Sequence, residues 1–385
     1  MIKPNKLTIG VLAFFFLFSI KATAGNKNHQ RTSTLDKKLQ GLAETMLDCK
    51  QGSIVAIDPR TGEIKCMASN SFFNDAVNRS IGMAYSPGST FKTAQALTLL
   101  SEHIVNEKSE YGCKEGFWRG NVHIGCHKHP SPMSMANALA HSCNAYFCKG
   151  FMAMLTNRNY KSKNEAIDKW FSYMQSMGLG VSLGVDMPGE VAGEMPNSAL
   201  LWRMFKGRWN EQTIMWVGMG QGEVQATPLQ LCNLAASIAN RGFFFTPHIH
   251  RYNVKDELYR KYNEKHVTKV NAKAYQVVID GMRRAVKAGT CADINTPLFD
   301  ICGKTGTAEN PGDDHSIFIG FAPMNNPKIA VCVYIENGGF GAEMAAPMAK
   351  IIMEQYLEGK LCEASQQKVK HWSEYIIVPN GEREH

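Results

Sequence analysis

The sequence lacks several features that define other classes of protein. Its 42 Lys and Arg residues form no dense basic stripe, so the net charge of +8 does not indicate binding to nucleic acid. Beyond the first 24 residues, no segment is long and apolar enough to cross a bilayer. We find no internal repeat, and the glycine-rich run at 218–222 lacks the lysine of a phosphate-binding loop. These absences indicate a globular domain that is neither a nucleic-acid-binding protein, a repeat protein nor a phosphate-loop nucleotide-binding protein.

The first 24 residues are typical of an export signal. Lys3 and Lys6 precede an apolar run at 7–20, and A-T-A at 22–24 supplies the small residues of a cleavage site. The run is short for a membrane span, which needs roughly 20 residues, but an uncleaved anchor in the inner membrane is kept as the alternative. Cleavage would remove three lysines and leave a net charge of +5. We therefore expect an exported, periplasmic or otherwise extracytoplasmic protein with a polar leader at 25–34.

Eleven cysteines are many for this length, and their odd number leaves at least one thiol unpaired. Export permits disulfides. The segment 107–132 combines cysteines with histidines, the residue types that bind zinc, but their spacing fits no common zinc motif. The residues considered are Cys113, His123, Cys126, His127 and His129. We favour a Cys113–Cys126 disulfide or a free surface loop, and we predict neither a metal nor a cofactor.

Periodicity and turn residues predict an α+β fold. The expected helices are at 35–47, 90–100, 137–154, 227–240 and 345–357, and the expected strands at 53–58, 63–68, 300–308, 316–322 and 328–336. The strands at the two ends of the chain must then share one antiparallel sheet, flanked by helices and by an all-helical region. We predict that this domain spans 35–362, with a long ordered loop at 107–132. The C-terminal tail at 363–385 is left without a structural assignment.

The string S-T-F-K at 89–92 follows a Pro-Gly turn and opens a predicted helix. Ser89 would therefore lie among unpaired backbone N–H groups at the positive end of a helix dipole. Lys92, three residues later, presents its amine on the same face. A lysine accepts the serine proton only when neutral, and burial and a neighbouring charge, such as Lys304, lower its pKa from about 10.4. The pair predicts a nucleophile and its base, against the alternative of a helix cap followed by an exposed lysine.

The string S-C-N at 142–144 lies at the end of an apolar helical stretch or just after it. The hydroxyl of Ser142 could pass a proton between Lys92 and a leaving amine, and the amide of Asn144 could bind a substrate carbonyl. The alternative is that both side chains only hydrogen-bond a local turn.

The string K-T-G-T at 304–307 lies in a predicted strand. Gly306 is costly in a strand unless something approaches its backbone closely, as a docking peptide-like substrate would. Lys304 and Thr305 offer a positive charge and a hydroxyl to a carboxylate. The backbone N–H of Thr307, with that of Ser89, could form an oxyanion hole, in which one donor is typically worth about 2.7–4 kcal/mol. The alternative is a hairpin with a glycine bulge.

The three strings, in this order, are those of penicillin-binding proteins and serine β-lactamases. One string alone is not diagnostic, because S-x-x-K recurs at 365–368 and S-x-N at 162–164. Over roughly residues 33–360, however, the chain resembles class B penicillin-binding proteins, specifically the transpeptidase domain of the elongation-type penicillin-binding protein 2 group. The matching strings are AIDPRTGEI at 56–64, YSPGSTFK at 85–92, SCNAYF at 142–147, DMPGE at 186–190, GQGE at 220–223 and GKTGTAEN at 303–310.

The resemblance implies the penicillin-binding, serine β-lactamase-like transpeptidase fold and a serine acyl-enzyme. Ser89 would attack the penultimate D-alanine carbonyl of a peptidoglycan stem peptide and expel the terminal D-alanine. The acyl group would then pass to an amine on a neighbouring stem, which forms a cross-link. β-Lactam antibiotics, which resemble D-alanyl-D-alanine, would trap Ser89.

Family members usually carry a pedestal domain between a membrane anchor and the transpeptidase domain, and it engages a glycosyltransferase. Here a few polar residues separate the signal from the first helix. The sequence therefore does not decide whether a glycosyltransferase or other cell-wall synthesis proteins bind this chain. The reaction also has alternatives. Water in place of the amine would make the chain a D,D-carboxypeptidase or β-lactamase, and acylation without turnover would make it a non-catalytic β-lactam-binding protein.

Overall fold

The computed structural model describes residues 31–71 and 75–377. The predicted export signal and residues 25–30 of the predicted leader lie outside these ranges. None of the helices within the described ranges combines the length and apolar character of a membrane span.

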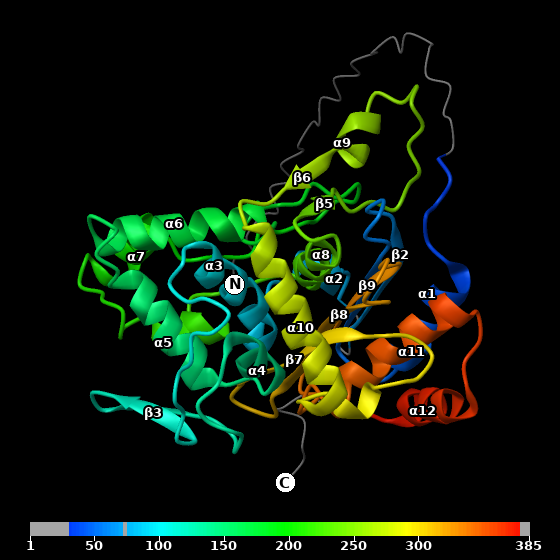
Figure 1. Ribbon diagram of the computed structural model, residues 1–385. Coiled ribbons are helices and arrows are strands. Elements are labelled where there is room, and N and C mark those ends of the chain that lie inside the picture. Colours follow the sequence, from blue (N-terminus) through cyan, green and yellow to red (C-terminus); the bar gives the residue numbers. More distant parts are fainter. Residues whose placement is uncertain (1–30, 72–74, 378–385) are drawn as a thin grey trace, which may run out of the picture. The chain divides into compact units, whose positions relative to one another are not determined.

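A five-stranded antiparallel sheet joins the two ends of the chain, as the sequence predicted (Figure 1). Its strand order is β2-β1-β9-β8-β7, so the N-terminal hairpin β1–β2 pairs with the last strand. The strands of this sheet are β1 (Gly52–Ile57), β2 (Ile64–Asn70), β7 (Cys302–Ala308), β8 (His315–Ala322) and β9 (Ile329–Ile335). Two small two-stranded sheets are formed by β3 (Gly116–Arg119) with β4 (Val122–Gly125) and by β5 (Phe243–Phe245) with β6 (Lys265–Val267).

Helices cover both faces of the sheet (Figure 1). Alternate residues of β1 belong to different cores: Ile54 packs with the helices α1, α11 and α12, and Val55 with α8, α10 and the helices that follow β2. The helices are α1 (Lys37–Leu47), α2 (Arg79–Gly82), α3 (Lys92–Ser101), α4 (Met135–Ala140), α5 (Asn144–Leu155), α6 (Lys163–Ser176), α7 (Ser198–Phe205), α8 (Pro228–Ala239), α9 (Tyr259–Asn263), α10 (Ala272–Ala288), α11 (Ala345–Glu358) and α12 (Glu363–Glu374). Within the described ranges there are also three short 3-10 turns: η1 (Gly88–Phe91), η2 (Met215–Met219) and η3 (Ala292–Ile294).

Helix α8 is buried along its whole length against the sheet. Its start was predicted from a threonine followed by proline, and the structure adds a reciprocal cap. The Thr227 hydroxyl accepts a hydrogen bond from the backbone of Gln230 (3.1 Å), and the Gln230 amide oxygen accepts one from the backbone of Thr227 (3.0 Å). Two otherwise unpaired backbone donors are thereby satisfied inside the core.

The predicted single helix at 137–154 is two helices, α4 and α5. The N–H of Ser142 donates to the carbonyl of Leu139 (3.2 Å), and the N–H of Cys143 to that of Ala138 (3.0 Å). This pair of bonds is the Schellman ending of a helix, in which the residue after the cap is left-handed and is usually glycine. Ser142 occupies that position with φ +55°, so the break has no glycine to mark it in the sequence.

The structure also assigns elements to the segment 107–132, where a loop was predicted, and to the C-terminal tail, which was left unassigned. The predicted loop at 107–132 contains the β3–β4 hairpin, whose strands of four residues are too short to show an alternating pattern. The C-terminal tail contains α12, which buries Trp372 in the core shared with α1. The buried amine of Lys50 donates to the Trp372 carbonyl and fixes this helix to the end of α1.

Candidate active site

The amine of Lys92 is the centre of the site. It is completely buried at the start of α3 and donates to the hydroxyl oxygens of Ser89 (2.9 Å) and Ser142 (3.1 Å). Ser89 lies in the turn η1 that leads into α3, so the three-residue spacing places both side chains on one face as predicted. Burial lowers the pKa of Lys92 to about 8, which brings its neutral, proton-accepting form within reach near neutral pH.

The helix break brings the second string to Lys92. The Ser142 carbonyl accepts from the lysine amine (2.8 Å), and so does the side-chain oxygen of Asn144 (2.5 Å). The Asn144 amide nitrogen donates to the Gly125 carbonyl on β4 (2.9 Å). Asn144 therefore orients Lys92 and ties it to the β3–β4 hairpin, while its predicted contact with a substrate carbonyl stays a prediction.

Lys304 lies on β7 beside this group and is also completely buried. Its amine donates to the Thr305 carbonyl (2.8 Å). The sequence suggested that the charge of Lys304 would lower the pKa of Lys92. Burial is instead the main cause of the lowered pKa of Lys92, and the repulsion between the two lysines lowers the pKa of Lys304. Burial and then the charge of Lys92 lower the pKa of Lys304 well below its usual range. The two lysines thus share one region from which water is largely excluded.

Gly306 lies close to other atoms of the protein itself, which the sequence did not indicate, while the approach of a substrate to its backbone stays a prediction. A Cβ at this position would lie 2.9 Å from the Thr90 methyl and 3.1 Å from the Pro87 carbonyl oxygen. A Cβ on Gly88 would similarly lie 2.8 Å from the carbonyl oxygen of Thr307. The turn that carries Ser89 therefore packs directly on β7, which brings Ser89 and Thr307 to the two sides of one gap.

A cleft of about 600 Å³ opens over these groups. Its lining includes the predicted residues Ser89, Ser142, Asn144, Thr305 and Thr307. Sequence reasoning missed Thr290, which follows α10, lines the same cleft and shares a hydrogen bond between hydroxyls with Thr305 (2.8 Å). It also missed His127, His141, Gln221 and the residues at 340–343 as parts of the lining. A threonine after a helix carries no recognisable signal, because its role depends on which strand the helix packs against.

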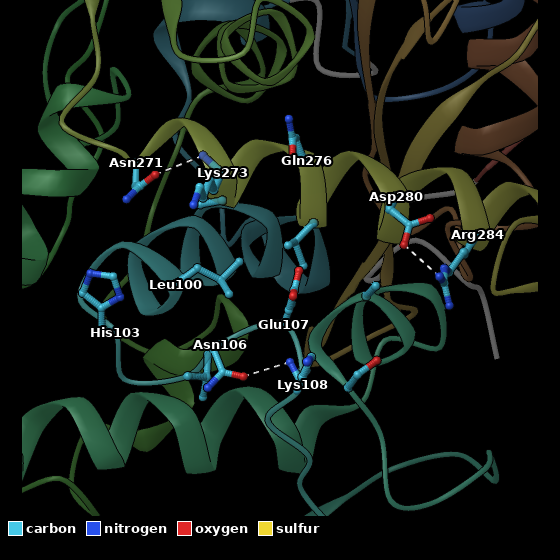
Figure 2. Close-up of a pocket in the computed structure, with 15 residues that line it drawn as sticks. Leu100, His103, Asn106, Glu107, Lys108, Asn271, Lys273, Gln276, Asp280 and Arg284 are labelled. Carbon is cyan, nitrogen blue, oxygen red and sulfur yellow. Dashed lines mark hydrogen bonds and ion pairs between the residues drawn. The ribbon is translucent and has the colours of Figure 1, made fainter.

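A larger cavity of about 830 Å³ lies between the end of α3, the start of α4 and α10 (Figure 2). Figure 2 shows Asp280 paired with Arg284 on α10 (2.9 Å), with Asn106 and Lys108 on the facing loop. Of the described residues that line it, none belongs to the three predicted strings. The smaller cleft is therefore the candidate active site, because Ser89 and Ser142 line it and both accept hydrogen bonds from the buried Lys92 amine.

Four possible metal ligands meet beside the second string. The ligand atoms of Cys113, Cys126, His129 and Cys143 all lie within 4.8 Å of one another, and His129 Nε2 is buried with no hydrogen-bond partner among the described residues. Both loop cysteines are free thiols, so the predicted Cys113–Cys126 disulfide is not formed. Hydrogen bonding from Cys143 lowers the pKa of Cys126 below its usual range and so favours the thiolate.

Three sulfurs with one imidazole are a donor set typical of structural zinc sites. The sequence did not reveal this set, because Cys143 stands in the second string and not in the loop with the other three residues. His123 and His127, which were considered with them, are not part of the cluster.

A family model described as the penicillin binding protein transpeptidase domain matches residues 52–354. The peptidoglycan D,D-transpeptidase MrdA of Acinetobacter baumannii is 31% identical over 380 residues, which cover 84% of this chain and 53% of that protein. MrdA of Escherichia coli K12 is 25% identical over 385 residues, which cover 86% of this chain and 58% of that protein. The chain thus spans about half the length of the curated relatives that it matches.

Among solved structures, PBP2 of Pseudomonas aeruginosa in complex with WCK 5153 superimposes with a TM-score of 0.75 at 29% identity, covering 87% of this chain and 81% of that one. The predicted α+β transpeptidase fold is confirmed. The chain belongs to the penicillin-binding protein transpeptidase domain family, and its similarity to MrdA and PBP2 confirms the predicted relation to the penicillin-binding protein 2 group.

Proposed function

We propose that the chain is a serine D,D-transpeptidase that cross-links peptidoglycan stem peptides through an acyl-enzyme. The observation that carries the proposal is the position of the Lys92 amine, which lies within hydrogen-bond distance of both Ser89 (2.9 Å) and Ser142 (3.1 Å). The names of the relatives in Acinetobacter baumannii and Escherichia coli, both peptidoglycan D,D-transpeptidases, support the same reaction.

Acylation begins with the neutral form of Lys92. With a pKa of about 8, about a tenth of this lysine is uncharged at pH 7. It removes the Ser89 proton while the oxygen attacks the carbonyl of the penultimate D-alanine. The negative charge that develops on the carbonyl oxygen is received by the backbone N–H groups of Ser89 and Thr307, in a gap set by the packing of Gly88 on β7.

The tetrahedral intermediate then loses its amine. The proton passes from Lys92 through the Ser142 hydroxyl to the nitrogen of the terminal D-alanine, the peptide bond breaks, and an ester to Ser89 remains. In the second half, the acceptor amine attacks this ester and gives its proton to Lys92 by the same route. The cross-link forms, and the Ser89 oxygen recovers its proton.

The carboxylate of the departing D-alanine is bound at the β7 edge of the cleft. The hydroxyls of Thr305 and Thr290, which already share a hydrogen bond, both face this edge. The approach of a carboxylate favours the charged form of Lys304, which burial and Lys92 otherwise disfavour. Substrate binding would in this way restore the positive charge that the sequence assigned to Lys304.

We further propose that the cluster of Cys113, Cys126, His129 and Cys143 binds a zinc ion. Cys143 stands between Ser142 and Asn144, so an ion held there would fix the second string to the loop before α4. Its role would be structural, because all four ligands come from the protein.

The expected setting is an exported enzyme that acts in the periplasm or another extracytoplasmic space. β-Lactam antibiotics would acylate Ser89 and block it. A solved relative at 27% identity with a TM-score of 0.73 belongs to a peptidoglycan synthase complex, which supports other cell-wall synthesis proteins as partners.

The test of the nucleophile is covalent labelling with a fluorescent penicillin. The full chain should gain the mass of one penicillin, and Ser89→Ala should gain none. Labelling of that variant at another residue would refute the mechanism.

A second experiment separates cross-linking from hydrolysis. The full chain is incubated with a stem pentapeptide, with and without an acceptor amine. The proposal expects release of D-alanine and a cross-linked product when the acceptor is present. Shortened peptide alone would identify a D,D-carboxypeptidase, rapid loss of the penicillin adduct a β-lactamase, and a stable adduct without peptide turnover a non-catalytic binding protein.

A further inference from the structure

We propose that Tyr85 and Glu336 form a positioning pair that sets the distance between the turn carrying Ser89 and the sheet that carries the K-T-G-T string. Neither side chain belongs to the catalytic strings or lines the cleft. The inference rests on the proposed function, because it takes Ser89 to be the nucleophile.

Tyr85 attaches the approach to the nucleophile to the end of β9. Its hydroxyl donates to Glu336 Oε1 (2.7 Å), directly after that strand. Its ring stacks on Tyr334 with a centroid distance of 4.4 Å, and the Tyr334 hydroxyl donates to the Ser86 carbonyl (3.3 Å). The two residues before the Pro-Gly turn are therefore held to one strand end.

Glu336 is itself fixed by two other segments. Its carboxylate accepts from Arg79 Nε (3.3 Å) and from the side chain of Gln51 (2.7 Å), which directly precedes β1. Arg79 is 3% exposed and is also paired in a bidentate manner with Asp75 (2.7 and 2.9 Å). A carboxylate held on both oxygens in this way has little freedom to follow the tyrosine, so it acts as a fixed point.

The pairing of the strands connects Glu336 to β7, the strand that carries the K-T-G-T string. Glu336 follows β9, β9 pairs with β8, and β8 pairs with β7, where Thr307 lies opposite Ser316 and Ser316 opposite Ile335. Ser89 lies on the turn that follows Tyr85, and Tyr85 contacts Glu336 at the end of β9. The hydrogen bond between Tyr85 and Glu336 thus closes a loop of contacts around the gap between Ser89 and Thr307.

Other contacts also hold the turn. The Tyr334–Ser86 hydrogen bond and the packing of Gly88 on β7 attach it to the sheet beside the Tyr85–Glu336 bond, and two backbone contacts attach it elsewhere. The backbone of Tyr85 exchanges hydrogen bonds with Ala226 (3.0 and 2.9 Å), and the N–H of Gly88 donates to the Gly220 carbonyl (3.0 Å). Both contacts tie the turn to the segment before α8 and not to the sheet. Loss of the tyrosine hydroxyl should leave the turn folded and packed on β7 but held less firmly relative to that strand. Since a displacement of about 1 Å can lower a reaction rate by about a hundredfold, the effect of a smaller shift is expected on the chemical step.

The experiment measures acylation of the full chain by a labelled penicillin under conditions that separate the dissociation constant of the initial complex from the acylation rate constant. Tyr85→Phe removes the hydroxyl and keeps the stacked ring. We expect the acylation rate constant to fall about tenfold, with the dissociation constant unchanged and the active fraction close to that of the native chain. Tyr252→Phe is the matched control, because it removes a tyrosine hydroxyl that also donates to a carboxylate, that of Asp186 (2.9 Å).

Glu336→Gln tests the other partner and retains an acceptor for Tyr85. We expect its acylation rate constant to fall less than that of Tyr85→Phe. A double variant whose acylation rate constant equals that of Tyr85→Phe within about twofold would show that the two groups act as one unit. Unchanged acylation in Tyr85→Phe, an equal loss in Tyr252→Phe, or a loss confined to the active fraction or to the dissociation constant would overturn the inference. Labelling of Ser89→Ala would instead refute the proposed function, so the two failures are distinguishable.

Discussion

Gly306→Ala tests how closely the nucleophile turn packs on the catalytic strand. The added Cβ would lie 2.9 Å from the Thr90 methyl, 3.1 Å from the Pro87 carbonyl oxygen and 3.2 Å from the Ile317 Cβ. Ordinary contacts of this kind begin at 3.4 Å, so the turn must move away from β7 by about 0.5 Å. None of these atoms is the free end of a long side chain, so the strain cannot be relieved by a rotamer change alone.

The displacement should affect chemistry more than folding. Overpacking of this size typically costs about 1–3 kcal/mol of the free energy of unfolding. The oxyanion donors must lie about 2.7–3.1 Å from the developing charge, and loss of one donor costs about 10²–10³ in rate. A shift of half an ångström weakens such a donor without removing it, so we expect acylation by penicillin to fall between about tenfold and a hundredfold.

The assay compares the acylation rate per folded molecule with the unfolding midpoint. Gly41→Ala is the control, because Gly41 lies within α1 and a Cβ there would meet nothing within 4 Å. This control should acylate normally and gain up to about 1 kcal/mol of stability from helix propensity. If Gly306→Ala acylated at the native rate while folded, the tight packing of the turn on β7 would not be what positions Ser89, and the reasoning would fail.

Three other predictions follow from single groups. Because acylation needs uncharged Lys92, whose pKa burial lowers to about 8, the rate should rise with pH, reach half its plateau near pH 8 and fall about tenfold per unit below it; a flat profile between about pH 6 and pH 9 would contradict this role. Metal analysis of the purified chain should find one zinc ion, and Cys113→Ser should lose it and lower the unfolding temperature; native chain purified without zinc and unable to bind added zinc would refute the site. Thr227→Ala removes the buried cap of α8 and should cost about 1 kcal/mol of the free energy of unfolding in urea, with normal acylation of the folded fraction; an unchanged unfolding midpoint would show that the cap contributes nothing.

Local patterns in the sequence predicted most of the elements that form the sheet and its covering helices. Strand β9 is a continuous apolar run and most of β8 is apolar, as expected for strands buried on both faces. The hairpin β1–β2 carries its own turn residues, and α8 carries its own proline and cap. These signals lie within a few residues of the element they define, so no tertiary information was needed. The β3–β4 hairpin was missed because its strands are shorter than one reliable period.

The site was predicted in its residue types but not in its geometry. The spacing of Ser89 and Lys92 places them together on any helix. The contact of Lys92 with Ser142 depends on a left-handed serine that ends α4, and serine there has no sequence signature. The close contacts of Gly306 with Thr90 and Pro87 were also not predicted, because a glycine in a strand does not indicate which atoms lie near it.

The order of apolar and polar residues determined by itself which segments form strands and helices, and three short strings determined which side chains carry the chemistry. Both kinds of information are local, because they depend on backbone preference and on the reactivity of individual groups. Only the tertiary structure decided that burial lowers the pKa of Lys92, that Cys143 joins three residues of a distant loop, and that Tyr85 meets Glu336. Those properties depend on which surfaces pack together, and packing brings together residues as far apart in the chain as Tyr85 and Glu336, which are separated by 251 positions.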